Sequence, residues 1–420
     1  MRSIIILLFP LVLFSQNTEE NKRNNLNQHQ IEWNTNLLFE SNGLNKGFLN
    51  TFLYGGYISN DLKDKWINLG SEKNVIYSEI SNSISYRNLK YNIGISIADR
   101  NIINGSFPDD LMRIYLFGNF DYQNKTIDFS NTNIRIDRFQ QYKLDYTYSI
   151  NSTNIQAGIS YLSGNYHTSF IIENGTFYTA PLGVYLDISY DINANVTDTS
   201  NLNMFVNNGN GMAFDIDIDL TLSSNTLNFY IQDLGFINWK EKSITYNTDS
   251  SFIFSGVEVE NIFTFNDSIL EEYNNDNYIQ KGNLSFKSYI PANIGFSIVH
   301  DIKNERVRSL SGCKSFSGGV NLRWQPYQNE KAPSFARIGQ GIKESNYTPL
   351  LWLSAVSNIK YLDIIPTLSY GGYSSDINLG VALSKGKKSN FILGTQHLED
   401  IFSGNNAKAV SIYFQILTQF

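Results

Sequence analysis

Apolar and polar residues alternate along many segments of the chain. In the segment MAFDIDIDLTLS (212–223) every second residue is apolar, and Asp215, Asp217 and Asp219 occupy three of the positions between. The same alternation, with small lapses, runs through residues 91–98, 143–150, 155–162, 292–302 and 377–384. Because successive side chains of a β-strand point to opposite faces, each segment predicts a strand with one apolar and one polar face.

Clusters rich in Asn, Gly, Ser and Asp lie between the alternating segments. They occupy residues 101–105, 163–165, 207–211, 386–390 and 404–406. Such clusters are typical of turns, so we expect strands to end there.

One segment, NDLKDKWINLG (60–70), has helical rather than alternating spacing. Asn60 or Asp61 is placed to cap its start, Trp66 lies on its apolar face, and Gly70 is placed to end it. We expect a short helix in a loop or inside a lumen.

Three architectures accommodate many alternating strands. A β-sandwich buries the apolar faces between two sheets, and a propeller or solenoid would show a repeat of fixed period, which the chain lacks. A transmembrane barrel turns the apolar faces to lipid and the polar faces to a wet lumen. The polar faces are rich in Gly, Ser, Ala, Asn and Asp, as expected of a crowded lumen, and Tyr and Phe gather at strand ends.

We therefore predict an all-β fold, a single transmembrane antiparallel β-barrel that covers residues 16–420. At ~10 residues per strand plus loops, this length allows roughly 12–16 strands, with room for a small plug or a short helix. A secreted, soluble β-protein is the alternative.

The C-terminal residues AVSIYFQILTQF read as a last alternating strand that ends on an aromatic residue. Ile412, Phe414 and Ile416 lie on its apolar face, and Phe420 is the terminal residue. This ending is similar to the C-terminal signal of bacterial outer-membrane barrels. We expect these four residues to be an assembly signal that the outer-membrane assembly machinery reads.

The N-terminal residues MRSIIILLFPLVLFSQ have the features of a cleaved signal peptide. Arg2 precedes an apolar run, 4–14, that is shorter than the ~20 residues needed to span a bilayer as a helix, and Ser15 is a small residue suited to cleavage. We predict a signal peptide over residues 1–15, with a membrane anchor as the alternative. No later run is long enough for a transmembrane helix.

Composition favours a fold with many strands and excludes some classes of partner. Charged residues make up 17% of the chain, below the about 25% of soluble globular proteins. The formal net charge of −7 argues against a nucleic-acid partner. The single cysteine, Cys313, excludes an internal disulfide. We expect a protein of the bacterial outer membrane, surrounded by lipid.

Several longer stretches resemble a known family. The most specific are QDLGFINWK (232–240) and YNTDSSFIFSGVEVENIF (246–263). Supporting stretches are residues 53–65 (LYGGYISNDLKDK), 159–170, 205–218 and 369–383 (SYGGYSSDINLGVAL). The chain resembles Bacteroidetes-type outer-membrane β-barrel proteins of unknown function, loosely grouped with fatty-acid-transporter-like barrels. The resemblance implies fold and location and no activity. Where that family is expected to carry an acidic residue before the glycine of F-x-F-x-G-V-E, this chain has Ser255.

Motifs for catalysis are missing from the sequence. It has no phosphate-binding loop, zinc-protease helix, nucleophile elbow or paired-cysteine motif. His167 lies close to Ser169, but the pair would need a third, orienting group to act in catalysis. We expect that the protein is not an enzyme and uses no cofactor.

The spacing of Asp215, Asp217 and Asp219 resembles the start of a calcium loop, but the chain between them does not. A calcium loop needs a bend with Gly at its sixth position, where this chain has Leu220. A strand would separate Asp215 from Asp219 by about 13 Å, at ~3.3 Å per residue. We expect no metal site and read the three carboxylates as lining the lumen.

Other charged residues fall on polar faces in the same way. We expect Lys143, Asp145 and Arg323 to line the lumen as well, with Lys143 and Arg323 as candidate partners of the aspartates. Such pairs would be simple packing or would set an electrostatic preference in a pore. Trp239 is a candidate interfacial anchor, with a plain packing role as the alternative.

Two functions fit these expectations. The first is a channel or transporter for small or partly apolar solutes. The second is a structural or assembly component of the cell envelope, such as a secretion or surface-display accessory, which binds envelope partners without transport.

Overall fold

The computed structural model describes residues 8–9, 28–198, 203, 205–255, 280–306, 308, 312–327, 336–359, 361–386 and 388–420. The strands are β1 (Leu8–Phe9), β2 (His29–Ser41), β3 (Lys73–Asn88), β4 (Ile93–Pro108), β5 (Lys125–Asp128), β6 (Thr132–Ile150), β7 (Thr153–Thr179), β8 (Leu186–Val196), β9 (Gly209–Leu222), β10 (Asn225–Trp239), β11 (Ile244–Phe254), β12 (Gln280–Asn283), β13 (Phe286–Tyr289), β14 (Ala292–Asp301), β15 (Cys313–Trp324), β16 (Thr348–Ile359), β17 (Leu362–Gly372), β18 (Asp376–Lys385), β19 (Ser389–Thr395) and β20 (Ala409–Gln419). The helices are α1 (Lys46–Tyr54), α2 (Asn60–Leu69), α3 (Asp109–Phe117), α6 (Ala336–Glu344) and α7 (Leu398–Ser403), with 3-10 turns η2 (Phe120–Tyr122), η3 (Pro181–Gly183) and η6 (Gly404–Asn406).

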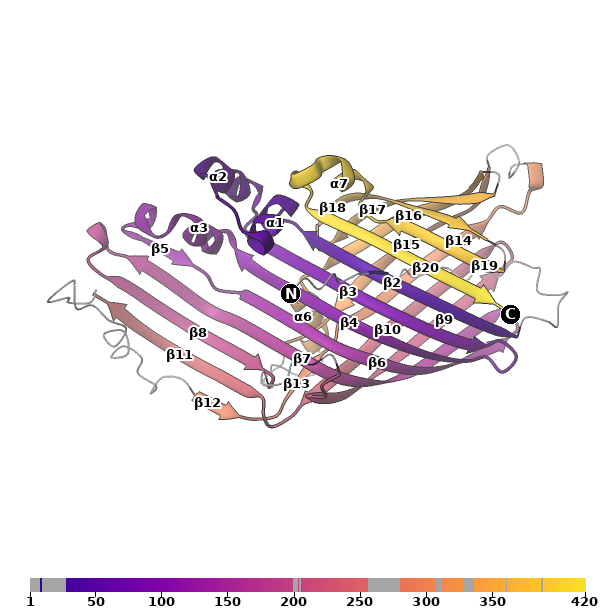
Figure 1. Ribbon diagram of the computed structural model, residues 1–420, viewed down its shortest axis with the longest axis horizontal. Coiled ribbons are helices and arrows are strands. Elements are labelled where there is room, and N and C mark those ends of the chain that lie inside the picture. Colours follow the sequence, from indigo (N-terminus) through magenta and orange to yellow (C-terminus); the bar gives the residue numbers. More distant parts are fainter. Residues whose placement is uncertain are drawn as a thin grey trace.

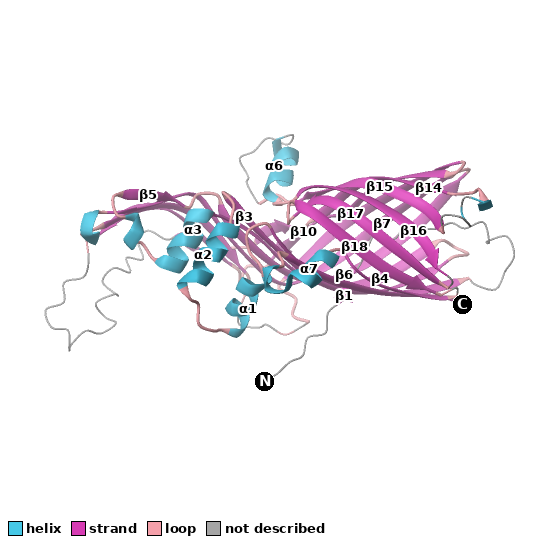
Figure 2. Cartoon of the chain, turned by 90° about the horizontal axis from the view of Figure 1, so that it is seen from above, coloured by secondary structure: helices cyan, strands magenta, loops and turns pink. Residues whose placement is uncertain are grey.

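A closed ring of 14 antiparallel strands forms the barrel (Figures 1 and 2). The ring contains β2, β3, β4, β6, β7, β9, β10 and β14 to β20. It closes where Gln30–Glu40 of β2 pair with Gln419–Ala409 of β20. Closure leaves no unpaired edge in the ring. The prediction of an all-β barrel with roughly 12–16 strands is therefore confirmed.

The two ends of the barrel differ in the length of their connections. At the end that holds His29 and Phe420, which we call the turn end, β3–β4, β6–β7 and β9–β10 are joined by 89–92, 151–152 and 223–224. The opposite end, the loop end, carries α1, α2, α3, α6 and α7 (Figure 2).

An apolar belt surrounds the outside of the barrel. Each of the 14 ring strands contributes a large apolar side chain that is substantially exposed. These residues, in ring order, are Trp33, Ile84, Ile95, Leu144, Ile159, Phe214, Phe229, Phe296, Phe316, Leu353, Leu368, Leu379, Leu393 and Ile412. Soluble monomers rarely expose an apolar surface that surrounds the whole molecule.

The wall continues beyond the ring on one side of the loop end. Residues 153–164 of β7 pair with β9 inside the ring, whereas residues 168–179 pair with β8. Strand β8 pairs with β11, and β11 with β12, so that an open sheet projects from the barrel (Figure 1). We call β8, β11, β12 and residues 168–179 the wall extension.

Helices α1, α2 and α3 form a second, smaller core next to β3 and β4. Trp66 and Ile67 of α2 and Met112 of α3 are buried there, packed against Ile76 and Phe107 of the two strands. The predicted helix over 60–70 corresponds to α2, which lies in a loop and ends before Gly70. Its N-cap is Ser59 rather than Asn60 or Asp61, and the Ser59 hydroxyl accepts from the N–H of Leu62.

Two of the predicted strand ends are wrong. Residues 101–105 lie inside β4, and residues 163–165 lie inside β7. Both strands continue because their neighbours supply backbone partners throughout, and a register shift opposite Arg138 and Phe139 absorbs Asn165 as a bulge.

Most of the predicted signal peptide lies outside the described residues. Of the predicted signal peptide, residues 1–15, only Leu8–Phe9 belong to the described residues, and they pair with β2. The signal peptide stays a prediction. No helix in the described ranges is long and apolar enough to cross a membrane.

A charge placed in the apolar belt tests which way the wall faces. We expect Leu144→Arg to lower the free energy of unfolding from lipid vesicles by about 2–4 kcal/mol, because the arginine would face hydrocarbon. Ser149→Arg, at the exposed turn end of the same strand, should leave it nearly unchanged. Denaturant titration followed by tryptophan fluorescence measures both, and equal stabilities would contradict a lipid-facing belt.

Candidate functional site in the barrel lumen

A one-residue bulge in β10 decides which side chains enter the lumen. The pairing with β9 shifts between Ile231 and Leu234, so two residues of β10 stand opposite Asp215. Asp233 has a φ of 60° there, and its N–H donates to Oδ1 of Asp215 at 2.6 Å. A bulge reverses the alternation of every residue that follows it.

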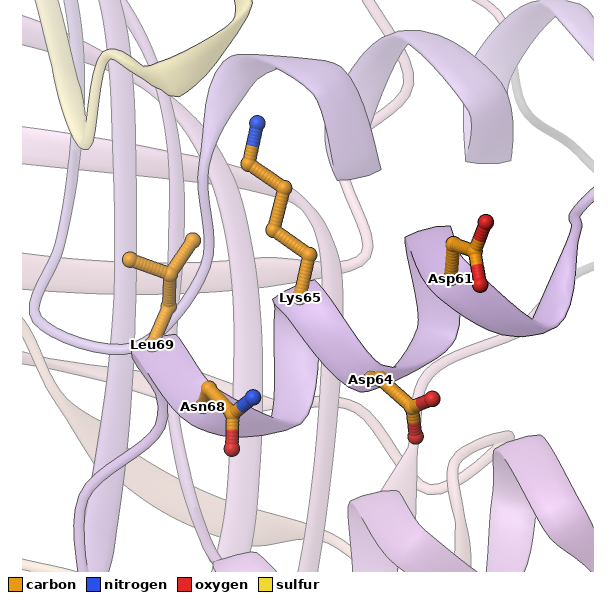
Figure 3. A pocket seen from close by; sticks show the side chains of 5 residues that line it. All are labelled: Asp61, Asp64, Lys65, Asn68 and Leu69. Atoms are coloured by element: carbon orange, nitrogen blue, oxygen red, sulfur yellow. The ribbon is translucent and has the colours of Figure 1, made fainter.

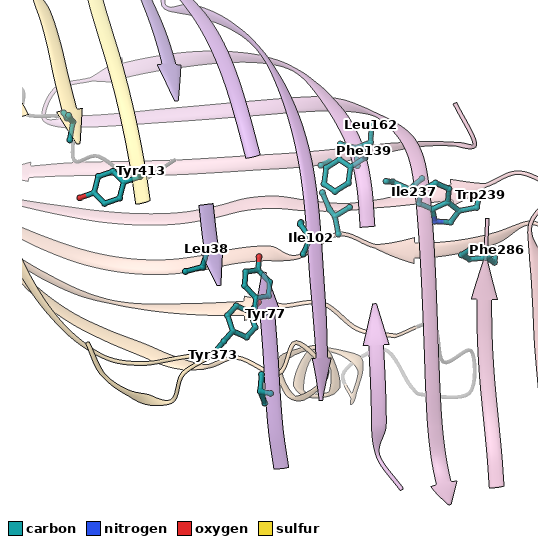
Figure 4. Packing of buried hydrophobic residues seen from close by; sticks show 14 of the residues in the cluster. Leu38, Tyr77, Ile102, Phe139, Leu162, Ile237, Trp239, Phe286, Tyr373 and Tyr413 are labelled. Carbon is teal, nitrogen blue, oxygen red and sulfur yellow. The ribbon is translucent and has the colours of Figure 1, made fainter. Parts of the chain in front are cut away.

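Trp239 is therefore not an interfacial anchor, and that prediction is wrong. Its side chain is 1% exposed, and its Nε1 donates to the hydroxyl of Ser288 at 2.8 Å. The indole stacks on the ring of His167 and packs near Ile237 and Phe286 (Figure 4). Counted from the alternation before the bulge, position 239 would face outward. The extra residue in β10 turns it inward, where it has the alternative role, plain packing.

Lys143 and Asp215 form an ion pair on the inner wall. Nζ of Lys143 lies 2.7 Å from Oδ2 of Asp215, although β6 and β9 are separated by β7. Gly158 of β7 stands between them, and a Cβ there would lie 3.0 Å from Cε of Lys143 and 3.1 Å from Oδ2 of Asp215. The missing side chain leaves the space in which the pair forms.

The other predicted aspartates also point inward. The amide of Asn228 donates to Asp217 at 2.6 Å and to Asp219 at 2.9 Å. Asp145 lies 2.5 Å from a guanidinium nitrogen of Arg87 and accepts from Gln156 at 3.0 Å. The carboxylates thus have hydrogen-bond donors.

Four charged side chains connect the walls of the barrel across the lumen. Arg100 of β4 lies 2.8 Å from Glu79 of β3 and 2.6 Å from Asp233 of β10. Arg323 of β15 approaches Glu79 to 3.8 Å, and β3 and β15 lie on opposite sides of the ring. We call Glu79, Arg100, Asp233 and Arg323 the lumen cluster. Its contacts cross the lumen at this level.

Tyrosines extend this group of contacts toward the loop end. The hydroxyl of Tyr77 donates to Oε2 of Glu79 at 2.7 Å, and the Tyr77 ring stacks on that of Tyr373. Tyr347 packs edge-on against Tyr373, and the guanidinium of Arg323 lies over the rings of Tyr77 and Tyr347. Cation–π contacts of this kind gain strength when they are removed from water.

The described parts of the connection between β15 and β16 contact β6. Arg135 of β6 donates to the carbonyl oxygens of Gln325, Pro326 and Glu344, at 3.0, 3.2 and 2.8 Å. One guanidinium thus fixes both ends of this connection.

Asp137 is a partner that orients His167, and the sequence spacing did not reveal it. Nδ1 of His167 lies 2.7 Å from Oδ1 of Asp137, and both side chains are 2% exposed. Oδ2 of Asp137 accepts from the amide of Gln325 at 3.4 Å. The pair is enclosed in the wall and braces the loop.

Sequence reasoning missed most of the lumen cluster, and for two different reasons. Glu79 and Arg100 fall on the polar faces of alternating strands, so the rule that selected Lys143 could have selected them. Asp233 lies in the bulge and Trp239 follows it, so the rule fails for both.

The predicted assembly residues lie at the seam of the barrel. Ile412 faces outward, and the ring of Phe414 packs edge-on against Trp33 of β2. Ile416 pairs in register with Trp33, and Phe420 exchanges backbone hydrogen bonds with His29. Their reading by assembly machinery stays a prediction.

A pocket of about 460 Å³ lies outside the lumen, on α2 (Figure 3). Its lining residues are Asp61, Asp64, Lys65, Asn68 and Leu69. Its two carboxylates and one ammonium come from a single exposed helix face. It shares no residue with the lumen cluster.

Substitutions at two aspartates of β9 compare a carboxylate held in an ion pair with one that only accepts a hydrogen bond. We expect Asp215→Asn to lower the free energy of unfolding by about 3 kcal/mol, because it leaves the ammonium of Lys143 without its closest partner. Asp219→Asn should cost about 1 kcal/mol or less, because it loses only part of a hydrogen bond. Denaturant titration in lipid vesicles compares them, and equal losses would contradict the assignment.

Comparisons with known proteins give a family and a distant likeness of shape. The toluene transporter TbuX of Ralstonia pickettii superposes with a TM-score of 0.41 at 8% identity, over 94% of this chain and 90% of TbuX. The toluene transporter TodX of Pseudomonas putida gives 0.31 at 7%, over 93% and 87%. The translocator domain of the autotransporter NalP of Neisseria meningitidis gives 0.33 at 7%, over 95% and 90%.

At these identities and scores the likeness carries nothing about activity. No curated protein was found to match the chain. A family model matches residues 24–396, and the chain belongs to that family, a family of unknown function (DUF5723).

Proposed function

We propose that the protein is an outer-membrane channel for small or partly apolar solutes that is closed at rest and opens by a change inside the lumen. The observation that carries the proposal is the lumen cluster, in which Arg323 and Glu79 meet from opposite walls at 3.8 Å. The groups that close the passage are ion pairs and tyrosines on different strands. Such contacts can be exchanged for contacts with water without unfolding the wall.

The outer membrane is the environment that the surface fits best. The apolar belt is suited to lipid on all sides, and barrels of this membrane have short periplasmic turns and longer outer loops. By that rule the turn end faces the periplasm and the loop end faces the outside. The partners expected in this environment are membrane lipid and the assembly machinery that reads the C-terminal strand.

The chemistry of the lumen favours a passage over a permanent plug. Glu79, Asp215 and Asp233 face Arg100, Lys143 and Arg323, so three acids are balanced by three bases. Replacing buried ion pairs with apolar residues is often neutral or stabilising, so a mere plug does not need them. We propose no enzymatic activity and no cofactor.

The second candidate is a structural or assembly component of the envelope, and the wall extension favours it. This open sheet projects beyond the ring, and Tyr190 of β8 and Phe252 of β11 pack together on one of its faces. A platform of this kind is suited to holding an envelope partner. In this role the barrel would anchor the platform and the lumen would stay shut.

Conductance in planar bilayers distinguishes the two. We expect little conductance from the wild type and about tenfold more from the double variant Glu79→Gln with Arg323→Gln, a shift of about 1.4 kcal/mol in a two-state equilibrium. The double change removes both charges, so neither is left unpaired. Arg113→Gln, which breaks only the pair with Asp109 on α3, should leave conductance unchanged.

Folding is checked for each variant by heat-dependent migration on SDS gels. A folded double variant that conducts no better than wild type would overturn the channel and leave the structural role.

A further inference from the structure

The connection between β17 and β18 folds into the mouth of the barrel. Tyr373, its first residue, is 1% exposed. Gly371 and Gly372 before it have φ values of 113° and 75°, in the region that favours glycine. A Cβ at Gly371 would collide with the carbonyl oxygen of Pro349. The inward fold therefore depends on two successive glycines, which are residues of the SYGGYSSD stretch.

The ring of Tyr373 fills the space between two walls. It stacks on Tyr77 with ring centroids 3.8 Å apart and an interplanar angle of 6° (Figure 4). Its other neighbour is Tyr347, at 4.8 Å and 72°. Because Tyr77 also donates to Glu79, the Tyr373 ring lies directly against the lumen cluster on the side of the loop end.

One carboxylate fixes the folded-in position. Oε2 of Glu40, on β2, accepts from the N–H of Tyr373 at 3.1 Å. Its Oε1 lies 2.9 Å from Nε2 of His397, whose Nδ1 lies 3.1 Å from Oδ1 of Asn378. Glu399 approaches Nδ1 of the same histidine to 3.8 Å. The backbone of the turn is thus tied through Glu40 to β2, which is separated from β18 in the ring by β19 and β20.

The closed arrangement leaves polar atoms unsatisfied. Within the described part of the chain, the hydroxyl of Tyr373 and the Nε and Nη1 atoms of Arg323 are buried without a hydrogen-bond partner. Burying such atoms without a partner costs free energy, and a hydrogen bond to water would remove that cost. An outward movement of the turn would admit water to them. The contacts at Glu40 and the tyrosine stack oppose that movement, which is the balance expected of a two-state element.

We propose that the β17–β18 turn is the gate of the lumen. Gly371 and Gly372 are its hinge, the Tyr373 ring is the closing element, and Glu40 with His397 is its latch. The inference rests on the proposed channel function and adds which segment moves.

Two substitutions test the gate from different sides. Tyr373→Ala removes the closing ring, and Glu40→Gln weakens the latch by removing its charge. We expect each to raise conductance in planar bilayers by about tenfold. Glu32→Gln is the matched control, because Glu32 lies on the same strand near the turn end, bonded to Asn34 and Gln415, and should change nothing.

Labelling gives a readout independent of current. Ser374, 5% exposed beside Tyr373, is replaced by Cys, and reaction with a membrane-impermeant maleimide is timed in vesicles. We expect slow labelling with Glu40 intact and about tenfold faster labelling with Glu40→Gln. The native Cys313 is buried, and the protein without Ser374→Cys provides its background.

The outcomes separate the gate from the channel. If the lumen-cluster double variant conducts while Tyr373→Ala and Glu40→Gln do not, the gate is overturned and the channel stands. If labelling is equally fast with and without Glu40, the latch is overturned. If no folded variant conducts, the channel fails and the gate fails with it.

Discussion

Backbone pairing between β2 and β20 is the constraint on which the rest of the structure depends. Once these strands pair, every strand of the ring has two neighbours and no edge is left. Each side chain of the ring must then point either to the surroundings or into a lumen of fixed width. Outward side chains can be large because no other part of the protein encloses them. Inward side chains must all fit into the limited volume of the lumen.

Shared volume explains the chemistry of the inner face. Large side chains stand beside glycines, as Lys143 and Asp215 do beside Gly158. Charges that cannot reach bulk water find partners on other strands, and Arg100 holds a carboxylate from β3 and one from β10. The result is a charge-balanced network that links strands far apart in the ring. Such a network is costly wherever an atom remains unpaired, as Nε of Arg323 does.

The loop end concentrates the features that lie outside a minimal barrel. Connections there fold inward over the mouth, held by Arg135 and Glu40, or outward as the wall extension. The turn end carries mostly short links and the C-terminal strand. This asymmetry places the elements able to move, and those able to meet a partner, on one side of the barrel.

The sequence by itself determined the class of fold and which face most side chains occupy. Period-two alternation is a local property, so Asp215, Asp217, Asp219, Lys143 and Asp145 could be assigned to the inner face without a structure. Arg323 could be assigned in the same way. Pairing between strands is not local, so the partners of these residues could not be read: Lys143 meets Asp215 across an intervening strand, and Arg323 meets Glu79 across the lumen.

Only the tertiary structure decided that Trp239 faces inward. The bulge at Asp233 exists because Asp215 satisfies its N–H and Arg100 its carboxylate, and both partners come from other strands. A single extra residue then inverts the faces of the rest of β10. The inward fold of Tyr373 has the same origin, since two glycines permit that conformation, and the contacts with Glu40 and Tyr77 select it.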